Sequence, residues 1–406
     1  MGEIFKTTSG GTPLSSCKEY YDGGNIPWIN SGELNTPFIN AAEHFITPIG
    51  LKSSSAKMLP VDSVLIAMYG ATAGRASLLK IPACVNQAIC AVLPSKNYSP
   101  LFLKYYLDTI YQHLVDLSSG SARSNLSQEV LQKVKIPFPD LPTQLRIAAI
   151  LGSIDKKIEL NRKKIAELEA LAKTIYDYWF VQFDFPDKNG KPYKSSGGKM
   201  VWNEQLKREI PDGWEVAQIK TICKIRSGHP FQAKTFKSNG IYGIVTIKNV
   251  QDGRIDFPSE AFIDKYPDSI PSEFILKQGD ILMSLTGYVG RVGLVTFSDC
   301  LLNQRVAIIL PKLDIYKCYL YCLFRSKLMK SKIENLSTGC AQKNVSPVDC
   351  ENIFIPFNAK YVSHFQAVIE STTNEYINLS RQTQQLVNLR DTLLPLLMNG
   401  QVEVKE

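Results

Sequence analysis

The sequence lacks the features that mark membrane and exported proteins. It holds no apolar run of 18 or more residues and no apolar core behind its first residues, which argues against a membrane span and against a signal peptide. Its nine cysteines form no Cys-x-x-Cys pair. Because scattered, odd-numbered cysteines are typical of free thiols in a reducing compartment, we expect a cytoplasmic protein.

Signatures of catalysis are absent as well. The four histidines form neither a His-Glu-x-x-His nor a deaminase pattern, so the ligands of a zinc hydrolase or deaminase are lacking. There is no Gly-x-Ser-x-Gly elbow and no Gly-x-Gly-x-x-Gly after a strand, and the loop Gly70–Arg75 lacks the spacing and the Lys-Ser/Thr pair of a Walker loop. We predict a chain that is not an enzyme and holds no metal or cofactor.

Composition is that of a soluble globular protein. With 406 residues, 44% hydrophobic and 21% charged, the chain is long enough for two or three domains with real cores. The net charge of +8 permits a nucleic-acid partner without proving one, because the placement of charge matters more than its sum.

What the sequence does have is an internal repeat, with a period of about 217 residues that is far too long for a solenoid. The second copy repeats an apolar run ending in Gly, a Gly-Arg pair, an Asn-Gln pair and a Ser/Thr-Gly…Asn-x-Ser loop. In order, these are Val64–Gly70 and Ile281–Gly287, Gly74-Arg75 and Gly290-Arg291, Asn86-Gln87 and Asn303-Gln304, and Ser118–Ser127 and Ser337–Ser346. The chain therefore carries two similar but non-identical working surfaces.

Each copy begins with strand-rich sequence and ends with a long helix. Short β-branched and aromatic runs predict strands near Trp28–Asn30, Val64–Ile66 and Ile89–Val92. A short helix is expected from Pro100 to His113. We predict an α+β fold of two similar globular domains with twisted β-sheets, joined by long helices.

Sustained heptads follow each strand-rich part, at a constant offset of about 218 residues. They predict helices of about 38 residues, some 55–60 Å long, whose apolar seams pack as in a coiled coil. The seam residues singled out are Ile154, Ile158, Asn161, Ile165, Leu168, Ile175, Trp179, Tyr376, Leu379, Leu386 and Leu393. Asn161 either fixes the register of the helix pair or lies where the seam turns toward solvent.

Domain limits follow from these patterns. We predict one globular domain over residues 1–140, a helix over 141–182, a second globular domain over 183–358, and a helix with a tail over 359–406. The Gly, Pro, Ser and Lys content of Asp184–Gly198, with a turn at Asn189-Gly190, indicates a linker over 183–209.

The turns after the apolar strands are candidate contact sites for DNA. Glycines allow a backbone to turn sharply, and an arginine there can meet phosphate oxygens or read guanine. The alternative is a tight turn whose arginine pairs with a carboxylate. The candidates are Gly70, Thr72 and Arg75 in the first copy and Gly287, Tyr288 and Arg291 in the second.

The loops near residues 120 and 340 share a frame but differ at their tips, as two readers of different DNA sequences would. The candidates are Ser121, Arg123 and Asn125 in one copy and Gln342, Lys343 and Asn344 in the other. Asn125 and Ser127 fit helix capping better than base contact. The paired Asn-Gln residues can bind adenine, but a structural amide network is the favoured interpretation.

The duplicated plan, the two Gly-Arg loops, the paired Asn-Gln, and above all Ala172–Pro186 followed by Ile210–Glu215 resemble the specificity subunit of type I restriction-modification systems, a host-defence family. The resemblance covers nearly the whole chain. It implies two target-recognition domains that each read half of a split asymmetric DNA site, held apart by two antiparallel helices that also dock two methyltransferase subunits.

In this family the chemistry belongs to partners. The resemblance implies that S-adenosylmethionine, ATP and magnesium bind to the methyltransferase and restriction subunits. A different class of function stays open, namely a coiled-coil adaptor whose duplicated domains bind protein or another ligand.

The start of the chain departs from the family pattern. The second copy runs from Ile210 to Ile219 before Ser227-Gly228, whereas the first reaches Ser9-Gly10 almost at once. A lead-in strand is therefore expected to be short or missing, unless the tail Gly400–Val404 takes its place.

Overall fold

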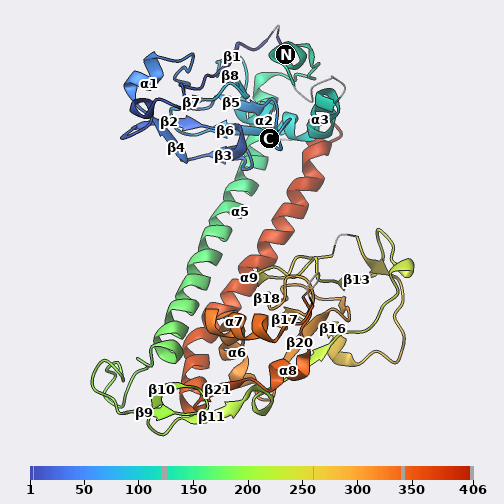
Figure 1. Ribbon diagram of the computed structural model, residues 1–406. Coiled ribbons are helices and arrows are strands. Elements are labelled where there is room, and N and C mark those ends of the chain that lie inside the picture. The colour runs from blue at the N-terminus through green and yellow to red at the C-terminus, as the bar shows by residue number, and fades with distance from the viewer. Residues whose placement is uncertain (3, 120–125, 259, 340–342, 403–406) are drawn as a thin grey trace. The chain divides into compact units, whose positions relative to one another are not determined.

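A computed structural model of the chain describes residues 1–2, 4–119, 126–258, 260–339 and 343–402. It divides into two compact units, one of Met1–Ile158 with Leu386–Glu406 and the other of Glu159–Gln385. The two long helices contribute a segment to each unit (Figure 1). The predicted domain limits follow secondary structure instead, and they stay a prediction.

The first unit is built on a five-stranded sheet of order β1-β8-β5-β6-β3. Only the pairing of β3 with β6 is parallel among these strands. Every residue of β5 is buried, because both faces of the sheet are covered. The bounds are β1 (Thr7–Ser9), β3 (Phe38–Ile39), β5 (Val64–Ala67), β6 (Ala76–Leu79) and β8 (Ile89–Val92).

Successive side chains of β5 point to opposite faces of the sheet and so belong to two separate hydrophobic clusters. Val64 and Ile66 pack with Leu103 and Leu107 of α2 (Pro100–Thr109), whereas Leu65 packs on the other face with residues of the smaller sheet. The predicted helix over 100–113 is in fact two, since α3 (Tyr111–Ser119) starts anew after Ile110. The remaining elements are β2 (Ile26–Ile29), β4 (His44–Ile46) and β7 (Cys84–Val85), in the order β4-β2-β7, with α1 (Pro48–Lys52) and α4 (Gln128–Lys133).

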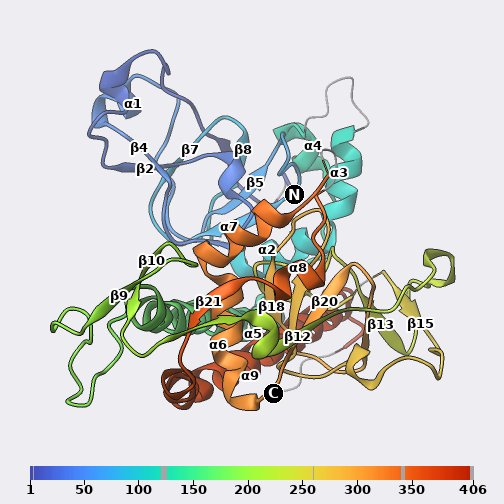
Figure 2. The same cartoon turned by 60° about the horizontal axis from the view of Figure 1, so that its bottom comes forward.

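The five-stranded sheet of the second unit repeats that of the first strand for strand. Its order is β12-β20-β17-β18-β14, and the pairing of β14 with β18 is again the parallel one. Figure 2 shows β12, β18 and β20 together with α6 beside them. The bounds are β12 (Cys223–Ser227), β14 (Gly253–Arg254), β17 (Ile281–Ser284), β18 (Val292–Leu294) and β20 (Val306–Pro311).

The second sheet of this unit has the order β15-β13-β19-β16. Its bounds, with those of the helices, are β13 (Tyr242–Val245), β15 (Phe262–Ile263), β16 (Ile275–Leu276), β19 (Cys300–Leu302), α6 (Lys317–Arg325), α7 (Lys327–Leu336) and α8 (Pro347–Glu351). The duplication and the α+β fold class predicted from the sequence are confirmed.

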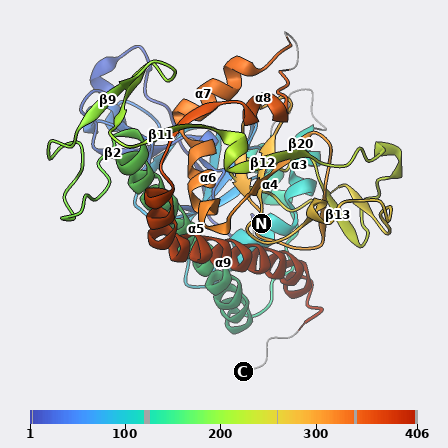
Figure 3. The same ribbon diagram turned by 90° about the horizontal axis from the view of Figure 1, so that it is seen from below.

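The heptad segments form α5 (Leu141–Tyr176) and α9 (Ala359–Met398), and α5 ends in a π-helical turn, Asp177–Val181. In the second unit the two helices are antiparallel, since Lys164 pairs with Glu375 while the Tyr176 ring lies 6.1 Å from that of Phe365. Helix α6 packs into the same core as this part of α9 (Figure 3). In the first unit Leu151 of α5 packs with Leu397 of α9.

Every predicted seam residue is buried or half-buried. Asn161 is only 1% exposed, so the alternative that it faces solvent is wrong. Its Nδ2 has no hydrogen-bond partner among the described residues. The seam therefore carries a buried polar group without a described partner, which costs stability. A role of Asn161 in fixing the register stays a prediction.

The segment predicted as a linker is folded into the second unit. A turn does form at Asn189-Gly190, where Gly190 has φ of +75°, but Phe183 and Phe185 are each 1% exposed. Their rings lie 5.4 and 5.3 Å from that of Trp214. Strands β9 (Met200–Asn203) and β10 (Arg208–Pro211) form a hairpin here. The linker prediction rested on the Gly, Pro, Ser and Lys content and ignored the aromatic side chains, which hold this segment in the core.

The two copies differ at their entry strands. In the second unit β11 (Glu215–Gln218) pairs with β21 (Phe354–Phe357), whereas the equivalent stretch 135–138 of the first unit is not in a strand. There the amino group of Met1 donates to the Val134 carbonyl at 2.7 Å. Of the tail, residues 403–406 lie outside the described residues, and Gln401 and Val402 form a bend.

Within the part of the chain that the structure describes, no helix combines the length and the apolar character that a membrane crossing requires.

Candidate nucleic-acid interface

The turn after β5 presents Arg75 on a fixed backbone. Gly70 and Gly74 have φ of +86° and +82°, a conformation that favours glycine. A Cβ at Gly74 would lie 3.2 Å from that of Leu114 in α3, so the turn is pressed against this helix. Thr72 is a structural clamp, because its hydroxyl donates to the Ser31 carbonyl at 2.8 Å.

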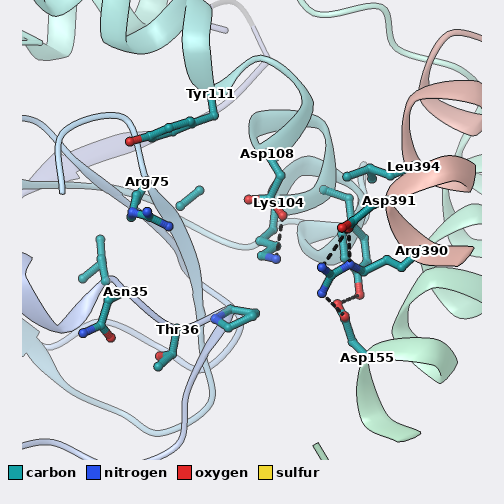
Figure 4. A pocket seen from close by; sticks show the side chains of 14 residues that line it. Asn35, Thr36, Arg75, Lys104, Asp108, Tyr111, Asp155, Arg390, Asp391 and Leu394 are labelled. Carbon is teal, nitrogen blue, oxygen red and sulfur yellow. Dashed lines mark hydrogen bonds and ion pairs between the residues drawn. The ribbon is translucent and has the colours of Figure 1, made fainter. Parts of the chain in front are cut away.

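Arg75 is exposed, and its guanidinium carbon lies 5.3 Å from the ring centroid of Tyr111. Figure 4 shows this arginine beside Tyr111, apart from the buried ion pairs of the same cleft. No described carboxylate forms an ion pair with it, so the turn leaves its hydrogen-bond donors available to a ligand.

The turn after β17 is the equivalent site in the second unit. Gly287 and Gly290 again have positive φ, +74° and +78°. The Tyr288 side chain is 72% exposed, and the guanidinium of Arg291 stacks 3.7 Å above its ring. Arg291 also donates to Gln251 Oε1 at 3.1 Å. This arginine is held more firmly than Arg75, by a cation–π contact and a hydrogen bond.

In each Asn-Gln pair the asparagine is half-buried and bonds within the fold, whereas the glutamine is exposed. Asn86 donates to Asn30 Oδ1 at 3.2 Å and accepts from the Ala88 amide at 3.1 Å, and Asn303 accepts from the Arg305 amide at 3.4 Å. The predicted structural amide network is thus confirmed for Asn86, whereas the Asn303 side chain bonds, among the described residues, only within its own turn. The glutamines, Gln87 and Gln304, are exposed.

One residue in each unit ties the repeated turns together. The Met68 amide donates to the Ala88 carbonyl at 2.8 Å, and the Met68 carbonyl accepts from the Leu126 amide at 2.7 Å. Leu285 makes the same two bonds in the second unit, to Arg305 at 3.1 Å and from Val345 at 3.0 Å. We call these clusters the three-turn surfaces: residues 70–75, 86–88 and 126–127 in the first unit, and 286–291, 303–305 and 343–346 in the second.

The third turn is only partly described. Ser121, Arg123, Asn125 and Gln342 lie outside the described residues. Ser127 caps α4 by accepting from the Val130 amide at 3.2 Å, as predicted. In the second unit Lys343 is exposed, and its carbonyl accepts from the Gly287 amide at 3.0 Å. Asn344 is a bracing residue, because its Oδ1 accepts from the Thr286 hydroxyl at 2.9 Å.

A hollow of about 430 Å³ lies at the second three-turn surface. It is lined by Thr286, Gln304, Arg305 and Asn344, together with Ser227, Leu285 and residues 345–347. All three repeated motifs of this unit therefore meet at one concave patch, which distant sequence positions alone could not reveal. Of the described cations on the second three-turn surface, Arg291, Arg305 and Lys343, only Arg305 lines the hollow. None of the three forms an ion pair with a described carboxylate, so this surface suits a polyanion.

A second cleft, of about 340 Å³, lies in the first unit beside Arg75 (Figure 4). Its buried polar groups, unlike the exposed Arg75, are paired with one another. Lys104 pairs with Asp108 at 2.7 Å, and Asp155 accepts from Tyr105 at 2.6 Å and from Arg390 at 3.0 Å. Burial raises the pKa of Tyr105, and the bond to Asp155 adds to that rise.

This buried network anchors the recognition part of the first unit to its segments of α5 and α9. The second unit has an anchor of its own, in which Tyr321 and Tyr376 both donate to the Gly253 carbonyl, at 3.1 and 2.7 Å. Sequence reasoning missed both anchors. The available signal was Arg390, a charged residue at a seam position that needs a buried partner.

The described residues include no group of three or more His, Cys, Asp or Glu side chains that could hold a metal ion. Most of the described cysteines are buried. Burial raises the pKa of Cys90 and of Cys322 to about 12. Such thiols are protonated at neutral pH and are poor nucleophiles.

Comparison with known proteins gives a consistent result. The family described as the type I restriction modification DNA specificity domain matches residues 1–170 and 211–386. The MjaIX specificity subunit of a type I restriction enzyme from Methanocaldococcus jannaschii is 28% identical, over 100% of this chain and 93% of that protein. The EcoR124I/EcoR124II specificity subunit from Escherichia coli is 28% identical over 46% of this chain and 48% of its own length.

A solved structure shares the fold. The crystal structure of the type I restriction-modification S subunit from M. genitalium superposes with a TM-score of 0.61 at 15% identity, covering 98% of this chain and 94% of the other. The chain belongs to the type I restriction-modification DNA specificity family.

Proposed function

We propose that this chain is the non-catalytic subunit that reads a bipartite, asymmetric DNA site for a cytoplasmic type I restriction-modification system. One observation carries the proposal. Both units present a three-turn surface built by the same hydrogen bonds, yet the side chains at the turn tips differ. Two surfaces with the same backbone framework and different exposed side chains suit two readers of different half-sites. Joining the two readers in one chain raises the effective concentration for the second contact.

The same chain is proposed to dock two methyltransferase subunits and restriction subunits. Exposed apolar side chains along α5 support this, because Leu145, Leu160 and Leu171 are 53%, 58% and 48% exposed. These leucines are the proposed contact points, because burial of exposed apolar side chains against a partner is favourable. S-adenosylmethionine, ATP and magnesium are proposed to bind on those partners, where adenine methylation and DNA cleavage would take place.

Salt dependence tests the proposal against an adaptor that binds protein or another ligand. In the assembled complex, binding to duplex DNA should weaken steeply between about 50 and 200 mM salt, because contacts to phosphates release counterions. Fluorescence anisotropy with a labelled duplex measures the slope. A flat response, or binding only to protein partners, would favour the adaptor.

A further inference from the structure

The turn at residues 303–305 differs from its repeat in one respect. Both turns keep the Asn-Gln pair, but Arg305 stands where the first copy has Ala88. Arg305 is exposed, whereas Ala88 is 2% exposed. The second unit thus projects a long cationic side chain from a position where the first unit projects none.

The backbone beneath Arg305 is fixed on several sides. The Gln304 amide donates to the His229 carbonyl at 2.9 Å, and the Asn303 amide to that of Val245 at 3.1 Å. The Arg305 carbonyl itself accepts from Leu285. An arginine whose backbone is held by such hydrogen bonds is suited to directional recognition, because less backbone entropy is lost on binding.

The guanidinium of Arg305 has no partner among the described residues. The other arginines between residues 191 and 358 all have one. Arg226 pairs with Glu273, Arg254 with Asp256, Arg325 with Glu169, Arg291 contacts Tyr288 and Gln251, and Arg208 donates to Val181. Arg305 therefore keeps its full set of donors for a ligand.

Two hollows flank this side chain. One, of about 430 Å³, is the patch shared with Thr286 and Asn344. The other, of about 470 Å³, is lined by Phe231, Phe236 and Lys248. Gln304 and Arg305 line both, so they form a ridge between two depressions, and a ridge can enter a groove.

We infer that Arg305 reads a guanine in the half-site of the second domain, by donating to its O6 and N7 in the major groove. The inference rests on the proposed function. The planar fork of an arginine matches these two acceptors, and this is the commonest specific contact to a base. Ala88 cannot make this contact, so the first half-site is read differently at the equivalent position.

The test is a double-mutant cycle on the assembled complex. The wild-type site is first read from methylated adenines in host DNA, and duplexes are then made with each guanine of the second half-site replaced singly by 7-deazaguanine, which lacks N7. At one guanine the wild type should lose roughly 10-fold in affinity, the value of one hydrogen bond to a charged group. Arg305→Ala should bind the unmodified site about 5- to 160-fold more weakly and lose nothing further on that substitution.

Arg254→Ala is the matched control, since Arg254 is an exposed arginine of the same unit that pairs with Asp256 at 2.8 Å. It should retain the full 7-deazaguanine effect. The assignment would be overturned if the 7-deazaguanine loss and the Arg305→Ala loss in affinity added at every guanine. It would also be overturned if the half-site had no guanine, or if Arg305→Ala bound DNA as tightly as the wild type. Thermal unfolding must match the wild type, and if it does not, Arg305→Lys replaces the alanine variant in the same cycle. Absence of any sequence-specific binding by the wild-type complex would instead overturn the proposed function itself.

Discussion

At the scale of single residues, the two Gly-Arg turns are alike in backbone and unlike in how they hold the arginine. Arg75 lies 5.3 Å from the Tyr111 ring, and Arg291 stacks at 3.7 Å on Tyr288 and bonds to Gln251. A ligand that binds Arg291 must therefore retain or replace the contacts with Tyr288 and Gln251. A ligand that binds Arg75 displaces fewer contacts.

Substitution of these arginines tests their role. Arg75→Ala and Arg291→Ala should each weaken duplex binding by about 1–3 kcal/mol if the arginine reads a base. Titrations with the assembled complex measure the loss. Circular dichroism melts of the same variants separate the two interpretations, because a fall in stability with unchanged intrinsic affinity would assign the arginine to the turn rather than to DNA.

At the scale of elements, Asn161 makes the helix seam less stable than it could be. Its side chain is buried and its Nδ2 lacks a described partner. Asn161→Leu should raise the free energy of unfolding by about 1–3 kcal/mol, since the cost of an unsatisfied buried group is removed. Urea denaturation gives the value, with Ile165→Leu as a seam control. Destabilisation by Asn161→Leu would show that the amide has a partner in solution.

Helix length is the second feature at this scale. We predict that one added heptad after Ala170 of α5, matched by one after Thr372 of α9, lengthens the spacer between the half-sites. A full heptad keeps the seam in phase, and about 10 Å of helix is added. Mapping methylated adenines in host DNA reads the spacer. Retention of the original spacer by an active complex would rule out the helices as the ruler.

At the scale of the whole molecule, the two units should be separable readers. Replacing residues 1–140 with the same region of a relative should change one half-site and leave the other intact, because each three-turn surface is built within its own unit. Methylome sequencing of host DNA detects the change. An unaltered recognition sequence, or a change in both halves, would contradict the model of two independent readers.

Sequence patterns determined much of this protein because they are local or repeated. Apolar runs and heptads predicted the β5 strand and the two packed long helices, since burial of an apolar face follows periodicity. Their antiparallel direction was implied by the family resemblance. The repeat predicted the duplicated sheets. The turn at Asn189-Gly190 and the cap at Ser127 followed from local backbone chemistry.

Only the tertiary structure decided which polar residues face inward. Asn86 bonds within the fold while its neighbour Gln87 is exposed, and Thr72 and Asn344 brace turns. The anchors through Asp155 and Tyr321 join positions 50 and 68 residues apart. Phe183 and Phe185 pack in the core, although their segment was predicted to be a linker. These outcomes depend on which segments meet in space, and no local pattern in one sequence encodes that meeting.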